Sequence, residues 1–116
     1  MIDYSANLKT ALDGLGIPVH YELFLHSGLA TPCISYMELS NVAAQEGNTL
    51  GYSNIQFQIK VWDCSIATIQ TYACQIDETL RPLGFRRIGS AELHDNNSAM
   101  IQKILTYECL ALENFS

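Results

Sequence analysis

The sequence predicts an α+β fold, with a mostly antiparallel sheet of about five strands and two helices packed on one of its faces. Segment 53–63 alternates apolar and polar residues, as a half-buried strand does. Segment 63–85 repeats apolar residues every three or four positions, as an amphipathic helix does. Because 116 residues is close to the usual size of one domain, we expect a single domain over residues 1–116.

Strand patterns account for most of the remaining chain. Besides segment 53–63, they occur at residues 17–27, 33–42, 85–95 and 101–112. The small and polar residues 43–51 predict a hairpin loop, and residues 96–100 predict a turn. Since most of these connections are hairpins, the strands should pair largely antiparallel.

Two segments carry helical spacing. The first, residues 3–15, has Asp3 or Ser5 as a possible N-cap and places Leu8 and Leu12 on one face. The second is the long helix of segment 63–85, in which Pro82 and Gly84 mark the end. Its candidate caps are Asp63 and Ser65, and its expected inward residues are Ile66, Ile69, Ala73, Ile76, Leu80 and Leu83.

The composition limits the classes of partner. Charged residues make up 16% of the chain, against about 25% in average proteins, so much of the surface must be uncharged, which suits a subunit of an assembly. Six basic residues face twelve acidic ones, giving a net charge of −6. We therefore expect no tight nucleic-acid binding, which depends on clustered Lys and Arg. The chain has no apolar run long enough to cross a bilayer, so we expect no membrane insertion.

The four cysteines predict reduced thiols, because no CxxC pair and no signal-peptide pattern occur. We expect Cys74 and Cys109 to act as small hydrophobic residues, and Cys64 to be buried near the start of the long helix. A reactive Cys64 at that helix start is the less favoured alternative, and capping accounts for the neighbouring Ser65.

Candidate chemistry is sparse. His20, Glu22 and His26 share one strand face, but one row of ligands from a single strand rarely completes a metal site. His94 and Asp95 could form an acid–base pair, although no nucleophile stands beside them, which favours a turn.

Adjacent arginines at 86 and 87 could hold an anion, yet neighbours at a strand start usually point to opposite sides, with one pairing to a nearby acid. No glycine-rich nucleotide loop occurs. We therefore expect no catalytic residue, no metal and no cofactor.

The polar face of segment 53–63 is the most informative surface. The opposite, apolar face of this segment already contributes to the core, so packing in the core does not explain the polar residues. They are joined by Gln102, Thr106 and Glu108 of the last strand, with Phe24 and Trp62 among them. Such a mixed polar and aromatic face lies either against water or against a partner.

Three stretches of the chain carry a resemblance to a known family. They are an N-terminal helix followed by "GIPVHYELFLHSGLATPCISYMELS", then "YSNIQFQIKVWDCSIATIQTYACQIDETLRPLGF" with its strand, Asp and long helix ending in Gly-Phe, and the closing "MIQKILTYECLA". With these, the chain resembles the tail completion or tail terminator proteins of long-tailed bacteriophages and prophages. The resemblance spans nearly the whole chain. It rests on the order of elements and a few short motifs, not on a catalytic signature.

The resemblance implies a structural protein of the virion, assembled in the bacterial host cytoplasm. It implies a homo-oligomeric ring, a hexamer in this family, at the head end of the tail, with the tail tube and head-completion proteins as partners. The polar face would then meet a neighbouring subunit through Asn54, Gln56, Gln58, Lys60 and Trp62. The loop at 43–51 would contact the tail through Gln45, Glu46 and Asn48. An acidic lumen would let DNA pass without binding it.

Two departures from the family leave alternatives open. The family often has a proline directly before the aromatic of its second strand, whereas Cys33 and Ile34 follow Pro32 here and Tyr36 comes later. Only Glu46 corresponds to the acidic residue usual in the next loop. The first alternative is a head-tail connector or minor capsid protein. The second is a small enzyme or ligand-binding protein. The third is a monomeric regulatory or toxin-neutralising protein.

Overall fold

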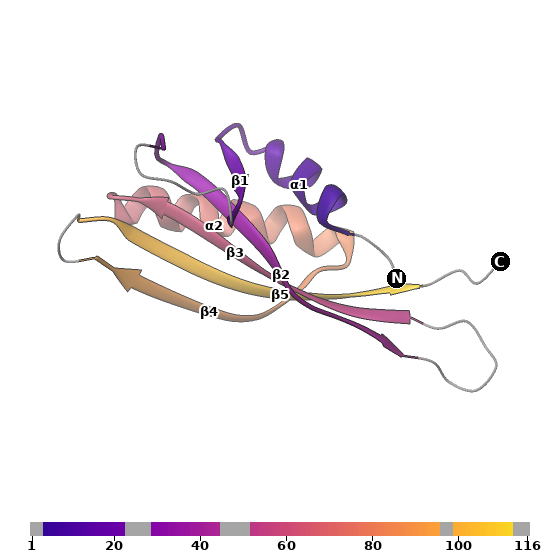
Figure 1. The fold of residues 1–116 in the computed structure, drawn as a ribbon. Helices are drawn as coiled ribbons and strands as arrows, with labels where there is room; N and C mark the ends of the chain where they lie inside the picture. The colour runs from indigo at the N-terminus through magenta and orange to yellow at the C-terminus, as the bar shows by residue number, and fades with distance from the viewer. Residues whose placement is uncertain (1–3, 23–28, 45–51, 96–98, 113–116) are drawn as a thin grey trace.

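The computed structural model describes residues 4–22, 29–44, 52–95 and 99–112. The elements in this part are α1 (Ser5–Asp13), β1 (Val19–Tyr21), β2 (Cys33–Ala44), β3 (Tyr52–Asp63), α2 (Ile66–Leu80), a 3-10 turn η2 (Arg81–Leu83), β4 (Arg86–His94) and β5 (Ile101–Leu112). The strands form one sheet in the order β1-β2-β3-β5-β4, and both helices lie on the same side of it (Figure 1). This confirms the predicted α+β class and its two-layer arrangement.

Three of the four strand pairs are antiparallel, and the exception is β1, which runs parallel to β2. Val19 is paired with Ile34 and Tyr21 with Tyr36. A hairpin cannot join parallel strands, and here the longer connection of residues 22–32 returns the chain to the start of β2. Within the described residues, the strand expected over 17–27 corresponds to β1, and residues 23–28 lie outside the described part of the chain.

The core is built on the apolar face of β3. Ile55, Phe57, Ile59 and Val61 are fully buried, and the helices cover this row. Full burial of such a side chain stabilises the fold by about 1.5–3 kcal/mol. The residues that complete the core from other elements include Leu8 and Leu12 of α1, Ile69, Ala73, Ile76 and Leu80 of α2, and Leu105 and Tyr107 of β5.

The helix ends follow local side-chain chemistry. Ser65 is the N-cap of α2, because its hydroxyl accepts a hydrogen bond from the backbone N–H of Thr68 at 3.3 Å. The helix then tightens into η2 and stops at Gly84, whose φ of 92° favours glycine. α1 begins after Tyr4 with no side-chain cap, so Ser5 is its first residue and not the cap that the sequence suggested.

Two residues expected to face inward are exposed, Ile66 and Leu83. Ile66 is the first residue of α2, and Leu83 belongs to η2, where the helical spacing of α2 no longer applies. The apolar stripe of α2 therefore runs only from Ile69 to Leu80.

A partly buried hydrogen bond joins α2 to the middle of the sheet. The hydroxyl of Tyr107, which is fully buried on β5, donates to Oδ1 of Asp77 on α2 at 3.0 Å. Burial, and then this hydrogen bond, raise the pKa of Tyr107 well above its usual value. Burial alone would raise the pKa of Asp77, but hydrogen bonds from Tyr107 and Arg81 and the charges of Arg81 and Arg87 outweigh it and lower that pKa.

We expect Tyr107→Phe to lower the free energy of unfolding by about 1–2 kcal/mol near neutral pH, because a buried hydrogen bond to a carboxylate is lost. The folded pKa of Asp77 lies below its unfolded value, so this stabilisation is present above about pH 4 and lost as the pH falls through the folded pKa. Urea unfolding at a series of pH values measures both effects.

The difference between the wild type and Tyr107→Phe should therefore shrink on acidification. A difference that stays constant from neutral pH down to the acid unfolding transition would show that the lost stability comes from packing, not from the bond to Asp77.

Candidate interaction surface on the outer face of the sheet

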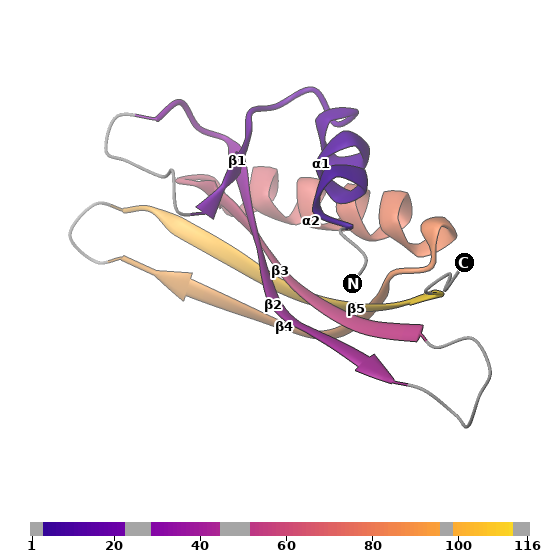
Figure 2. The same cartoon turned by 45° about the vertical axis from the view of Figure 1, so that its right-hand side comes forward.

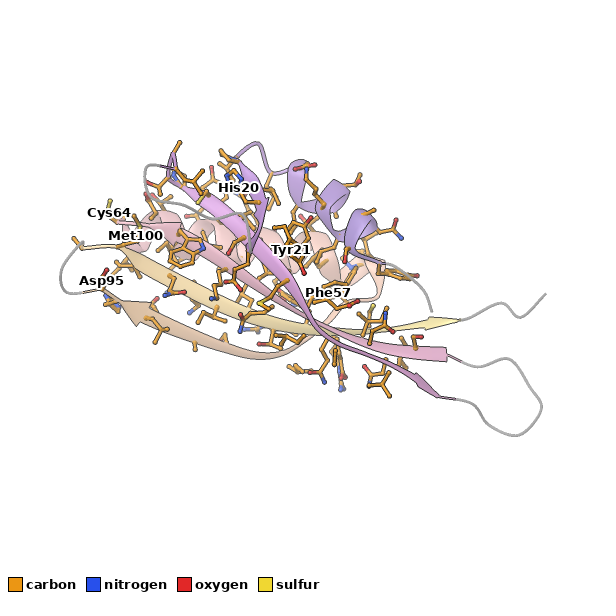
Figure 3. The ribbon with its side chains drawn as sticks, in the orientation of Figure 1. His20, Tyr21, Phe57, Cys64, Asp95 and Met100 are labelled. Atoms are coloured by element: carbon orange, nitrogen blue, oxygen red, sulfur yellow. The ribbon has the colours of Figure 1, made fainter. Side chains whose placement is uncertain are left out.

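The outer face is the side of the sheet turned away from the helices, and its central row comes from β3. The row consists of Asn54, Gln56, Gln58, Lys60 and Trp62, each of which is partly buried between buried neighbours along the strand. Side chains stand on both faces of the sheet in Figure 3. The predicted alternation of β3 is confirmed, and all five residues predicted as interface share one face.

Strand register decides what lies beside this row. Gln58 at the centre pairs with Met37 of β2 and Thr106 of β5. Asn54, near one end, lies between Val42 and Leu110, which are 60% and 67% exposed. The outer face is therefore polar at its centre and has an exposed apolar pair at this end, which the sequence pattern alone does not show.

The charges of the outer face are paired within the chain. The ammonium of Lys60 forms a 2.5 Å salt bridge with Glu22, and it lies 5.7 Å from the centre of the Trp62 ring. Glu108 of β5 pairs with Arg86 at the start of β4. The centre of the face thus presents amides and neutralised charges, which can be buried against a partner at lower cost than free charges.

Trp62 is held by its own subunit. Its indole N–H donates to the hydroxyl of Ser35 at 2.9 Å, and Ser35 is fully buried on β2. Trp62 is therefore partly buried and ties β3 to β2, whereas the sequence suggested an exposed anchor. The alternative that it packs against Phe115 concerns a residue outside the described part of the chain.

Two buried amide oxygens of the outer face lack a hydrogen-bond partner, Oδ1 of Asn54 and Oε1 of Gln102. An unsatisfied buried acceptor costs about 1–3 kcal/mol. In the strand register Asn54 lies beside exposed Val42 and Leu110, and Gln102 lies beside exposed Leu93 of β4. Both ends of the face thus place an unpaired buried acceptor beside exposed apolar side chains.

The residues of the candidate metal and acid–base sites are not brought together in the described part of the chain. Within the described residues no three His, Cys, Asp or Glu side chains lie close enough to hold a metal, and His26 falls outside them. Glu22 is engaged by Lys60, and His94 contacts Glu92 at 3.4 Å. Figure 3 labels His20 on β1 and Asp95 at the end of β4, so these groups come from opposite edges of the sheet.

The described cysteines are free, and their positions correct two expectations. Cys64 and Cys74 are exposed, whereas the sequence suggested burial, because Cys64 precedes α2 and Cys74 faces away from the core. Cys33 and Cys109 are buried, and burial raises the pKa of both thiols. Raised pKa values disfavour the thiolate and hence nucleophilic chemistry at these two residues.

The adjacent arginines point to opposite sides, as expected. Arg86 pairs with Glu108 on the outer face, and Arg87 lies 3.5 Å from Asp77 on the helix side. Both arginines thus have an acidic partner, whereas the sequence suggested one.

The hairpin of β2 and β3 is longer than expected. The strands reach Ala44 and Tyr52, and Figure 2 shows them extending past the helices. The proposed tail-contact residues Gln45, Glu46 and Asn48 lie outside the described part of the chain. No helix in the described part of the chain is long and apolar enough to cross a membrane.

Comparison with known proteins rests on the fold. No protein-family model and no curated protein matches the sequence. The chain is similar to one in a solved structure titled "Virion of native gene transfer agent (GTA) particle", with a TM-score of 0.67 and 15% sequence identity. The match covers 91% of this chain and 84% of that chain. The two chains therefore share a fold over nearly their whole lengths.

We expect Ser35→Ala to lower the free energy of unfolding by about 1 kcal/mol, because the Trp62 indole loses its acceptor. Trp62 is the single tryptophan, so its emission reports on this position alone. The emission maximum of the folded variant should shift as water replaces the hydroxyl. Unchanged emission and stability would mean that the Trp62–Ser35 bond does not form in solution.

Proposed function

We propose that this chain is a structural protein of a phage or prophage virion, resembling tail terminators. In this role it forms a ring at the head-proximal end of the tail and helps to join tail to head. The observation that carries the proposal is the outer face, which has amides and paired charges at its centre and exposed apolar residues at its ends. The fold shared with a chain of a virion particle supports the same role.

The proposed subunit contact is centred on the β3 row. Gln56 and Gln58 offer amide donors and acceptors to a neighbour, and the exposed side chains of Val42 and Leu110 extend the contact at one end. Lys60 and Trp62 contribute mainly to the shape of this surface. Lys60 is already paired with Glu22, and Trp62 already donates a hydrogen bond to Ser35. By the resemblance, the ring is a hexamer, and the loop with Gln45, Glu46 and Asn48 meets the tail tube.

The charge of the chain fits passage of DNA through such a ring. Twelve acidic residues against six basic ones would repel a phosphate backbone, so DNA could move through the lumen without tight binding. The proposed role requires no catalytic residue, cofactor or metal. It places the protein in the virion after assembly in the host cytoplasm.

A head-tail connector or minor capsid protein is the second candidate, because a shared fold with a virion chain supports it equally. The two roles differ in the partner that is bound. A terminator ring binds isolated tails, and a connector binds filled heads. Co-sedimentation of the purified chain with each particle separates them.

We expect purified protein to form a discrete species several times heavier than the 12.9 kDa of one chain. Light scattering measures this mass, and negative-stain images should show rings. A single-chain mass at every concentration, without rings, would contradict self-assembly.

We expect Gln58→Glu to weaken assembly, because it places a carboxylate at the centre of the proposed contact, where it must lose water without a paired cation. Asn7→Asp is the matched control, since it makes the same chemical change on the exposed surface of α1. Light scattering of both variants at equal concentration gives the comparison, and circular dichroism verifies folding. Equal assembly of the two variants would remove Gln58 from the interface.

A further inference from the structure

The strand β4 presents an open edge of the sheet. It lies at one end of the strand order, so β5 pairs with one side of it and, among the described residues, no strand pairs with the other. Figure 1 and Figure 2 both show it along the rim of the sheet. All of its residues except Glu92 are exposed. An edge of this kind is a template on which a further strand can pair.

The middle of β4 lacks the usual devices that prevent such pairing. Edge strands often carry lysine, proline or an inward-pointing charge for this purpose. Residues 88–91 read Ile-Gly-Ser-Ala and carry none of these. One irregularity is present, a shift of register between Arg87 and Gly89 that leaves Ile88 as an extra residue. From Gly89 to His94 the ladder with β5 is regular, so this part of the strand can accept a second partner.

Two opposite charges of β4 stand on the same side of the sheet. Arg87 lies 3.5 Å from Asp77 of α2. Glu92 accepts a hydrogen bond from Gln70 of α2 at 3.4 Å. Since both side chains contact the same helix, both point to the helix side.

The strand register puts Ser90 midway between these two charges. Arg87, Ser90 and Glu92 pair with positions 107, 105 and 103 of β5, which are evenly spaced. Two β4 strands paired antiparallel about a two-fold axis at Ser90 would therefore set Arg87 of each copy opposite Glu92 of the other. An axis at Gly89 would set Arg87 opposite Ser90, and an axis at Ala91 would set Glu92 opposite Ser90. Of these three axes, only the one at Ser90 joins the two charges, and opposite charges directly across a strand pair stabilise it.

Both charged groups retain exposed surface for this contact. The side chains of Arg87 and Glu92 are 47% and 28% exposed. Their contacts with α2, at 3.5 Å and 3.4 Å, are long for hydrogen bonds, so each group can gain from a closer partner. On the outer face the same register sets the exposed side chain of Leu93 opposite Arg86 of the second copy, whose aliphatic stem can cover it.

We propose that β4 pairs antiparallel with β4 of a second copy of this chain, with the two-fold axis at Ser90, so that the two sheets become one. Backbone hydrogen bonds join the strands, and the two contacts between Arg87 and Glu92 fix the register. The same strand supplies both charges at matching positions, which favours self-pairing over an unrelated partner. This inference does not rest on the proposed ring, because it uses the edge of the sheet and not its outer face.

Disulfide trapping tests the register. The exposed cysteines are first removed by Cys64→Ser and Cys74→Ser. In this background, Ser90→Cys places two thiols directly opposite each other across the axis, within reach of a disulfide. We expect oxidised glutathione, as the oxidant, to produce a disulfide-linked dimer of the full chain, measured on non-reducing gels over time.

Ala91→Cys in the same background is the matched control. Ala91 is exposed and adjacent to Ser90 on the same edge. In the proposed register it lies opposite Gly89, so the two introduced thiols would sit on a diagonal of about 7–8 Å, which is too long for a disulfide without backbone movement. We expect Ser90→Cys to form the dimer several times faster.

Charge exchange tests the contact between Arg87 and Glu92. Added to Ser90→Cys, Glu92→Arg should slow dimer formation about two- to tenfold, because like charges then face each other twice. Arg87→Glu should slow it similarly, and a mixture of the two variants should form mixed dimers at the original rate, identified by mass. Asp13→Arg is the matched control, since it makes the same change of net charge on α1. Circular dichroism verifies folding, and Glu92→Arg alone decides the matter if Arg87→Glu does not fold.

Several outcomes would overturn the proposal. Equal rates for Ser90→Cys and Ala91→Cys, a faster reaction of Ala91→Cys, or no dimer from either would exclude pairing about Ser90. An unchanged rate in Glu92→Arg would exclude the charge contact. Trapping is also measured with Gln58→Glu, which weakens the proposed ring contact. Trapping that persists there supports a separate edge contact, and trapping that is lost would assign the contact to the outer face.

Discussion

The two-residue period of β3 is the constraint on which the rest of the structure depends. This strand lies at the centre of the sheet and is paired on both sides along its length, so its side chains have only two directions. One row ends in the core beneath the helices, and the other must form the outer face. A shift of register by one residue would exchange the rows and expose Ile55, Phe57, Ile59 and Val61.

This constraint explains how much could be predicted from the sequence. Periodicity was sufficient for α2, β3 and β5, because each carries a long alternating or helical pattern whose apolar side is buried. It also placed Asn54, Gln56, Gln58, Lys60 and Trp62 on one face. It could not show that β1 runs parallel to β2, because the direction of pairing depends on the course of the connecting segment.

Sequence patterns do not show contacts between residues that are far apart in the chain. The hydrogen bond from Trp62 to Ser35 joins residues 27 positions apart, and the hydrogen bond from Tyr107 to Asp77 joins residues 30 positions apart. The exposed apolar pair at one end of the outer face is likewise apparent only in the structure, because it depends on the strand register that places Val42 and Leu110 beside Asn54. Trp62 is partly buried because of this folded neighbourhood, which the sequence pattern alone does not show.

The central claim is that the outer face is covered by a neighbouring subunit, and Trp62 provides the most direct probe of it. Its fluorescence can be quenched by acrylamide at increasing protein concentrations, with the mass followed in parallel. We predict that quenching falls as the mass rises, because assembly closes access to this face. Unchanged quenching across a rise in mass would show that the subunits meet elsewhere and would contradict the account.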